Sequence, residues 1–120
     1  LVDSNNKKIM FVQHVAGLLG LDNVNAVKAR TEDYAPGYRF DTVIARAVAT
    51  VPRLLGFAGH HVGEDGVFIA LKGQYPAEEL EAVPNEMAEE WAIEVTELDV
   101  PGLEDGSRHA VLLRRNRVDV

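Results

Sequence analysis

The sequence predicts an α/β fold in which a doubly wound, mostly parallel sheet ends in an antiparallel pair of strands. Two observations carry this prediction. Short continuous apolar runs, typical of strands buried on both faces of a parallel sheet, alternate with stretches of helical periodicity. The last two strand-like stretches leave no room for a helix between them, which favours an antiparallel connection.

The composition limits the classes of protein to which the chain can belong. The 120 residues suffice for one domain, or part of one, and the apolar share of 47% is ordinary for a soluble globular chain. No apolar run is long enough to cross a membrane. The absence of cysteine excludes disulfides and thiolate metal sites and fits a cytoplasmic protein. A net charge of −7 argues against a surface coated in nucleic acid, although it permits a local basic site.

The chain opens on what reads as the end of a buried strand, Leu1-Val2, with Asp3 at its carboxyl end. A short polar side chain can cap the next helix, because its oxygen accepts from the free amides of the first turn; the candidates are Ser4, Asn5 and Asn6. Apolar residues at helical spacing predict the packed stripe of this helix; they are Phe11, Val12, Val15, Leu18 and Leu19. Gly20 is placed to close the helix in a left-handed cap.

The central strand is expected over residues 40–47, where a buried run is followed by the charge of Arg46. A shorter strand over residues 24–29 comes before it, and Pro36-Gly37 breaks the chain between the two. An unpaired buried guanidinium is costly, so Arg46 is expected to serve a ligand. The alternative is that Arg46 leaves the sheet for water or a surface carboxylate.

The second half predicts a helix over residues 51–61, with Pro52 tolerated in its first turn, and then a turn over residues 63–66. The clearest buried strand follows and ends in Lys72-Gly73. Pro76 opens a short acidic helix. The final strands are expected over residues 91–100 and 109–113.

Four predicted strands end in polar residues, and the carboxyl ends of parallel strands share the edge of a sheet where ligands bind. These residues are Asp3, Thr31-Glu32, Arg46 and Lys72. An acid in such a place typically accepts from ribose hydroxyls, which favours a nucleoside-type ligand. The sequence has no phosphate-binding P-loop and no Gly-x-Ser-x-Gly elbow, and the adjacent pair His60-His61 lacks the spacing of a zinc site.

Six stretches of the chain, in order and at matching spacing, resemble the glucose-inhibited division protein B family of small-subunit ribosomal RNA methyltransferases. The stretches are residues 1–8 with Phe11, then 29–33, 40–47, 70–73, 100–103 and 108–111. The resemblance implies a Rossmann-like class I methyltransferase sheet that uses S-adenosylmethionine. It also implies methylation of guanine N7 in 16S ribosomal RNA, with that RNA or the small ribosomal subunit as the partner.

The resemblance assigns roles to individual residues. Thr31 and Glu32 are expected to contact the adenosine part of the cofactor, Arg46 to lie in the cofactor site, and Asp3 to bind the ribose. Lys72 and Arg108 are expected to contact the RNA substrate. No catalytic base and no metal are expected, because guanine N7 carries an exposed lone pair and needs only alignment with the methyl donor.

The family's glycine-rich loop and first strand are not found in these residues, so we expect residues 1–120 to be a partial methyltransferase domain that is inactive alone. Two other functions stay open at this point. One is an NAD-dependent oxidoreductase fragment, in which Asp3 would bind the same ribose. The other is a non-catalytic module that only binds a partner.

Overall fold

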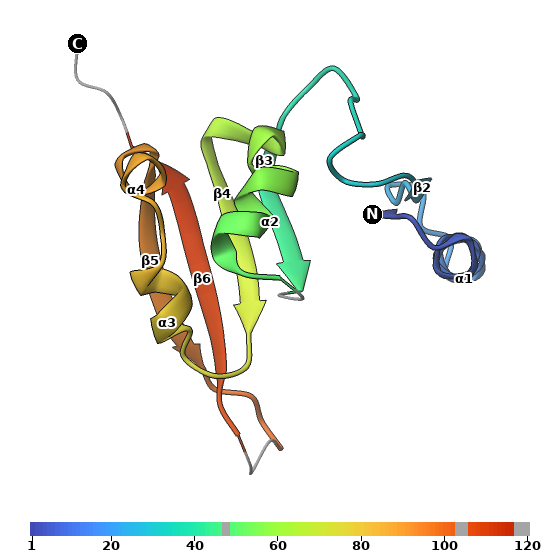
Figure 1. Ribbon diagram of the computed structural model, residues 1–120. Coiled ribbons are helices and arrows are strands. Elements are labelled where there is room, and N and C mark those ends of the chain that lie inside the picture. The colour runs from blue at the N-terminus through green and yellow to red at the C-terminus, as the bar shows by residue number, and fades with distance from the viewer. Residues whose placement is uncertain (47–48, 103–105, 117–120) are drawn as a thin grey trace. The chain divides into compact units, whose positions relative to one another are not determined.

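The computed structural model describes residues 1–46, 49–102 and 106–116. The chain divides into two compact units, Leu1–Pro36 and Gly37–Val120 (Figure 1). The sequence-based expectation of one partial domain over residues 1–120 stays a prediction.

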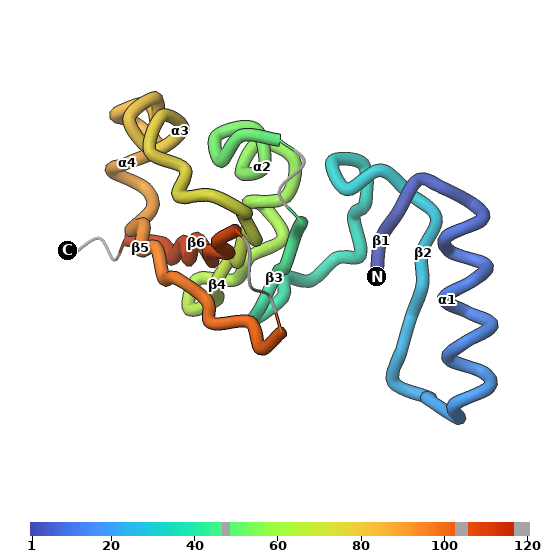
Figure 2. Tube along the Cα trace, turned by 90° about the horizontal axis from the view of Figure 1, so that it is seen from below, coloured from blue at the N-terminus to red at the C-terminus, as the bar shows by residue number. Residues whose placement is uncertain are grey.

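The first unit is a strand–helix–strand arrangement. Strands β1 (Val2–Asp3) and β2 (Val27–Lys28) pair in parallel, and helix α1 (Asn6–Leu18) connects them. Parallel neighbours need such a crossover, because a tight hairpin cannot join them. Figure 2 shows α1 lying alongside the two strands. The strands are short, so the edge where β1 and β2 end is close to the helix that follows β1.

Both ends of α1 follow the sequence-based prediction. The Asn5 side chain caps the helix and accepts a 3.1 Å hydrogen bond from the Lys8 amide, while Gly20 adopts the left-handed φ of 66° just beyond the last turn. The predicted apolar stripe is only partly correct. Ile9 is the buried residue of the helix, whereas Phe11 and Leu18 are 67% and 73% exposed. A two-stranded sheet is narrow and covers only a strip of the helix surface.

The second unit contains a four-stranded mixed sheet in the order β3-β4-β6-β5. Its strands are β3 (Phe40–Arg46), β4 (Val62–Lys72), β5 (Trp91–Leu98) and β6 (Arg108–Arg115). β3 and β4 are parallel, while β6 pairs antiparallel with both β4 and β5. The predicted antiparallel pair at the end of the chain is therefore confirmed. Ala47, the expected last residue of the central strand, lies outside the described residues.

Helices cover one face of this sheet, as both views show (Figures 1 and 2). They are α2 (Val51–Ala58), continued by a 3₁₀ turn (Gly59–His61), then α3 (Ala77–Glu81) and α4 (Asn85–Glu90). The core lies between α2 and the sheet and contains Val51, Leu54, Leu55, Ala58, Val62, Phe68, Ala70, Trp91, Val111 and Leu113. No helix in the described parts of the chain is long and apolar enough to cross a membrane.

The opposite face of the same sheet carries apolar side chains that no described element of this unit covers. Ile44 is 62% exposed, and Leu71 in the neighbouring strand is also exposed. Alternate residues of a strand point to opposite faces, so their neighbours Val43 and Ala70 pack instead against the helices. The sheet is thus apolar on both faces, as the continuous apolar runs of the sequence predicted.

Residues 63–66 were expected to form a turn, and this expectation is wrong. They belong to β4, where the register with β3 is interrupted between Phe40, which faces Val62, and Thr42, which faces Val67. Glycine and acidic residues are frequent in turns, but here tertiary pairing with β3 decides the structure. A Cβ atom on Gly66 would lie 2.9 Å from the carbonyl oxygens of Phe40 and Asp41. Only glycine fits this close approach of two backbones.

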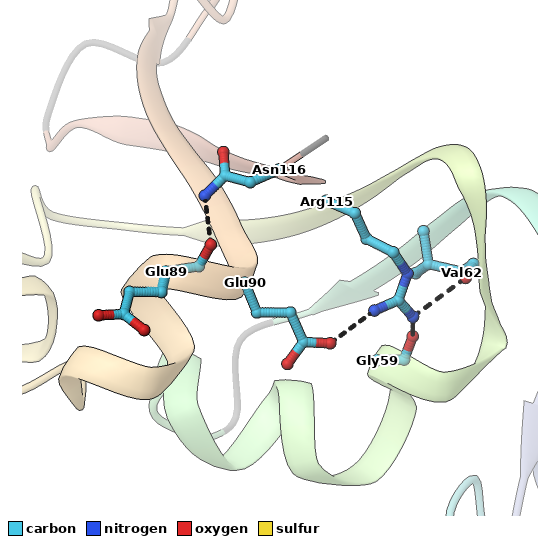
Figure 3. Close-up of polar contacts among 6 residues, drawn as sticks. All are labelled: Gly59, Val62, Glu89, Glu90, Arg115 and Asn116. Carbon is cyan, nitrogen blue, oxygen red and sulfur yellow. Dashed lines mark hydrogen bonds and ion pairs between the residues drawn. The ribbon is translucent and has the colours of Figure 1, made fainter. Parts of the chain in front are cut away.

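The end of β6 is held by Arg115 (Figure 3). Its guanidinium donates to Glu90 Oε1 at 2.8 Å and to the carbonyl oxygens of Gly59 and Val62 at 2.8 and 3.2 Å. It also lies 4.4 Å from the ring centre of Trp91, a cation–π distance. Arg115 thereby ties β6 to the end of α4 and to the turn that leads into β4.

Candidate functional site

Three of the residues expected to bind a cofactor lie around one hollow in the first unit. The hollow has a volume of about 310 Å³. Its lining residues come from the ends of β1 and β2 and from the segment after β2: Val2, Asp3, Ser4, Ala29, Arg30, Thr31 and Glu32. The two sides are joined by a 3.1 Å hydrogen bond from the Ala29 amide to the Asp3 carbonyl. The parallel pairing of β1 and β2 therefore brings these side chains to one place.

The polar groups of this hollow are partly committed to the chain. Asp3 Oδ1 accepts a 2.7 Å hydrogen bond from the Asn5 amide, which fixes the carboxylate at the start of α1. Its other oxygen has no hydrogen-bond partner among the described residues. Glu32 is exposed and lies 4.0 Å from the Arg30 guanidinium, a separation that leaves its carboxylate accessible. Two carboxylates and the Thr31 hydroxyl give the hollow acceptors for hydroxyl and amino groups of a ligand.

The second unit gathers the other three predicted residues at one edge of its sheet. Arg46 is the last residue of β3 and faces Leu71, so Lys72 ends β4 one residue beyond it. Lys72 in turn faces His109, the neighbour of Arg108 at the start of the antiparallel β6. Arg46 is exposed and forms no hydrogen bond or ion pair with the described residues. Arg108 is also exposed, and its Nη1 donates to the Ser107 carbonyl at 2.9 Å.

Lys72 differs from Arg46 and Arg108 because its ammonium group forms an ion pair within the second unit. Its side chain is only 9% exposed. The ammonium donates to Glu79 Oε1 at 2.7 Å and to the Ala49 carbonyl at 2.8 Å. Contact of Lys72 with RNA stays a prediction, but the ammonium is directed toward α3 and the start of α2.

A histidine pair lies near the start of β4, at the opposite end of that strand from Lys72. The rings of His60 and His61 are 4.0 Å apart. Burial lowers the pKa of His60, and the neighbouring charges of His61 and Arg39 lower it further. Within residues 1–46, 49–102 and 106–116, no three histidine, cysteine or acidic side chains gather as metal ligands would.

Comparison with known protein families shows which family this chain belongs to. The model of one family, described as rRNA small subunit methyltransferase G, matches residues 1–111. The chain belongs to this family. Ribosomal RNA small subunit methyltransferase G of Idiomarina loihiensis is 44% identical over 116 residues, which are 96% of this chain and 54% of that relative. The enzyme of the same name from Cronobacter sakazakii is 42% identical and is covered to 55%. The chain thus spans about half the length of these relatives.

Solved structures show the same fold. An rRNA methylase from Streptococcus thermophilus has a TM-score of 0.67 at 10% identity, with 97% of this chain and 72% of that chain covered. A mutant of MtNAS, solved in complex with S-adenosylmethionine, has a TM-score of 0.63 at 18% identity, with 95% and 44% covered. The fold is therefore the Rossmann-like class I methyltransferase fold that the sequence predicted, and its sheet ends in an antiparallel strand pair.

The sequence predicted the polar residues at the ends of the strands. It did not predict that Glu79 would contact one of them, Lys72. Glu79 lies in α3 and accepts from both Lys72 and the Val51 amide. A signal was present, because an acidic helix directly follows the strand that ends in Lys72. Sequence alone gives no sign of which of its three glutamates faces inward, and the short helix has no apolar periodicity to orient it.

Proposed function

We propose that this chain is part of an S-adenosylmethionine-dependent enzyme that methylates guanine N7 in the 16S RNA of the small ribosomal subunit, in the cytoplasm. The observation that carries the proposal is the hollow around Asp3, Thr31 and Glu32, at the ends of parallel strands in a chain of the methyltransferase G family. Ligands of open α/β sheets bind at this edge.

The chemistry of the hollow fits an adenosine group. The free oxygen of the Asp3 carboxylate can accept from a ribose hydroxyl, and Thr31 and Glu32 supply acceptors for the adenine amine. Arg46, exposed at the end of β3, is proposed as the fourth cofactor residue. The cofactor would supply an electrophilic methyl group on its sulfonium. The residues of the chain bind and orient the two partners.

The choice of acceptor fits the residues as well. Guanine N7 presents a lone pair that needs no deprotonation, so no residue is proposed as a general base. These 120 residues contain no cysteine, the nucleophile of the covalent route to cytosine C5. Arg108 is proposed as a contact to RNA phosphate, because it is an exposed cation at the edge where β4 ends.

The test is a thermal-shift titration of the full-length protein, because the 120 residues span about half of their relatives. A ligand that binds only the native state raises the melting temperature. S-adenosylhomocysteine is therefore expected to raise it, by an amount that grows with concentration, and NAD to leave it unchanged. The reverse pattern would favour the oxidoreductase alternative. No shift with either compound, together with intact RNA binding, would favour a module that only binds its partner.

The position of the methyl group is tested separately. We expect 16S RNA treated with the enzyme and S-adenosylmethionine to break at the modified guanine after borohydride reduction and aniline treatment, which act on N7-methylated guanine. Methyl transfer into RNA without such breaks would overturn the proposed acceptor atom while leaving the cofactor assignment intact.

A further inference from the structure

The second unit contains an ion pair that its predicted RNA-binding role does not explain. Lys72 Nζ and Glu79 Oε1 are 2.7 Å apart, with side chains 9% and 25% exposed. Taking two charges out of water is costly unless the geometry is good and further hydrogen bonds satisfy both groups. Both groups meet this condition, because each has a second partner in the same segment of the chain.

The second partners lie on either side of the start of α2. Lys72 Nζ donates to the Ala49 carbonyl at 2.8 Å, and Glu79 Oε1 accepts from the Val51 amide at 3.0 Å. The Thr50 side chain, at the capping position of α2, forms no capping hydrogen bond. Glu79 therefore takes the place of the missing cap from another helix. The pair joins the end of β4 and the middle of α3 to the residues at the start of α2.

These joined residues follow Arg46 in the chain. Arg46 ends β3, and Ala49 and Val51 come three and five residues later. Lys72 and Glu79 therefore hold Ala49 and Val51, which follow Arg46 among the described residues and lie at the start of α2. Catalysis by alignment depends on such supports, because a displacement of about 1 Å at a reacting group can reduce the rate about 100-fold.

We propose that Lys72 and Glu79 form a latch that holds Ala49 and Val51 at the start of α2, and that both are positioning residues for methyl transfer. This inference rests on the proposed function. In this proposal Glu79 matters for catalysis as much as Lys72 does. If Lys72 instead contacted RNA phosphate directly, Glu79 would have no such role. An acid cannot share a phosphate-binding role, so the behaviour of Glu79 separates the two explanations.

The test compares Lys72→Met, Glu79→Gln and the double variant in the full-length protein. Glu78→Gln is the matched control, because Glu78 neighbours Glu79 in α3 but is exposed. We expect both single variants to lower kcat by about 10- to 100-fold, measured well below the melting temperature on folded enzyme. The salt dependence of RNA affinity should not change in either variant, and the control should match the wild type in all measurements.

A second readout reports the latch directly. Hydrogen exchange at the Val51 amide should accelerate in Glu79→Gln and in Lys72→Met, since both disturb the carboxylate that this amide binds. The double variant should unfold at a higher temperature than either single variant, because it leaves no buried charge without a partner.

Three results would overturn the latch. A flatter RNA salt dependence in Lys72→Met with normal kcat in Glu79→Gln would make Lys72 a phosphate contact. Lower melting temperatures with unchanged kcat in both variants would make the pair merely structural. If the wild type proves not to be a methyltransferase, the proposed function fails on its own test. The latch is then tested by hydrogen exchange alone, and an unchanged exchange rate of the Val51 amide in both single variants would overturn it.

Discussion

Arg46 forms no hydrogen bond or ion pair with the described residues, and its expected role in binding a ligand stays a prediction. It ends a strand whose preceding residue, Ala45, packs against the core, yet its own side chain is exposed. It forms no ion pair with the described residues, so its removal leaves no buried partner unsatisfied. Arg115 shows the opposite case, because its guanidinium joins three backbone or side-chain oxygens and a tryptophan ring.

We therefore predict that Arg46→Ala in the full-length protein lowers methylation at least about 100-fold, the order of magnitude for a lost electrostatic contact in a reaction site. The free energy of unfolding without ligand should change by no more than about 0.5 kcal/mol in either direction, the usual range for a surface substitution, so the melting temperature should stay close to that of the wild type. Methyl transfer to RNA and thermal unfolding are the two measurements. Arg114→Ala is the charge-matched control, because Arg114 is an exposed arginine with a 4.0 Å ion pair. Loss of the fold in Arg46→Ala would show that its role is structural.

At the scale of elements, the sequence predicted every strand but not every boundary. Continuous apolar runs indicate buried strands, so the sequence predicted β3 and the second half of β4. The start of β4 was missed, because Gly63-Glu64-Asp65-Gly66 has the composition of a turn and is held extended by the neighbouring backbone. Helix α4 was also missed, since its six residues are too few to show an amphipathic period.

Gly66 and Gly56 provide a paired test of this interpretation of β4. Gly66→Ala should destabilise the protein by about 1–3 kcal/mol, the usual cost of forcing atoms into a packed site, because the new methyl group meets two backbone oxygens at 2.9 Å. Gly56 lies inside α2, with nothing within 4 Å of an added Cβ. Gly56→Ala should therefore stabilise the protein by about 0.4–1 kcal/mol, through the loss of freedom in the unfolded chain. Urea unfolding measures both, and equal effects would contradict the close approach at Gly66.

At the scale of the whole molecule, the predicted site residues fall into two groups, one in each compact unit. Asp3, Thr31 and Glu32 belong to the first, and Arg46, Lys72 and Arg108 to the second. The sequence could predict which strand ends carry polar residues, because the rule that ligands bind at such ends is general. It could not predict that Lys72 is nine-tenths buried, since the acid that pairs with it lies seven residues away in an element with no orienting pattern.

The charge of the chain bears on the proposed contact with RNA. With a net charge of −7, these residues offer no general attraction to phosphate, so we expect the proposed RNA contact to depend on a few placed cations. Arg108 is an exposed cation at the proposed substrate edge, whereas the ammonium of Lys72 is occupied by Glu79. We predict that Arg108→Ala in the full-length protein weakens RNA binding and reduces the slope of log affinity against log salt by about 0.7–0.9, the contribution of one phosphate.

Titrations of RNA at several salt concentrations measure this slope, with Arg114→Ala as the control for a charge lost elsewhere on the same strand. Both variants remove one positive charge, so a general field effect would change the two slopes alike. A contact at Arg108 changes only one of them. Affinity for S-adenosylhomocysteine should stay at the wild-type value in Arg108→Ala, because we place Arg108 with the substrate and not with the cofactor. Equal slopes for the two variants would remove Arg108 from the RNA contacts, and a parallel loss of cofactor affinity would move it to the cofactor site.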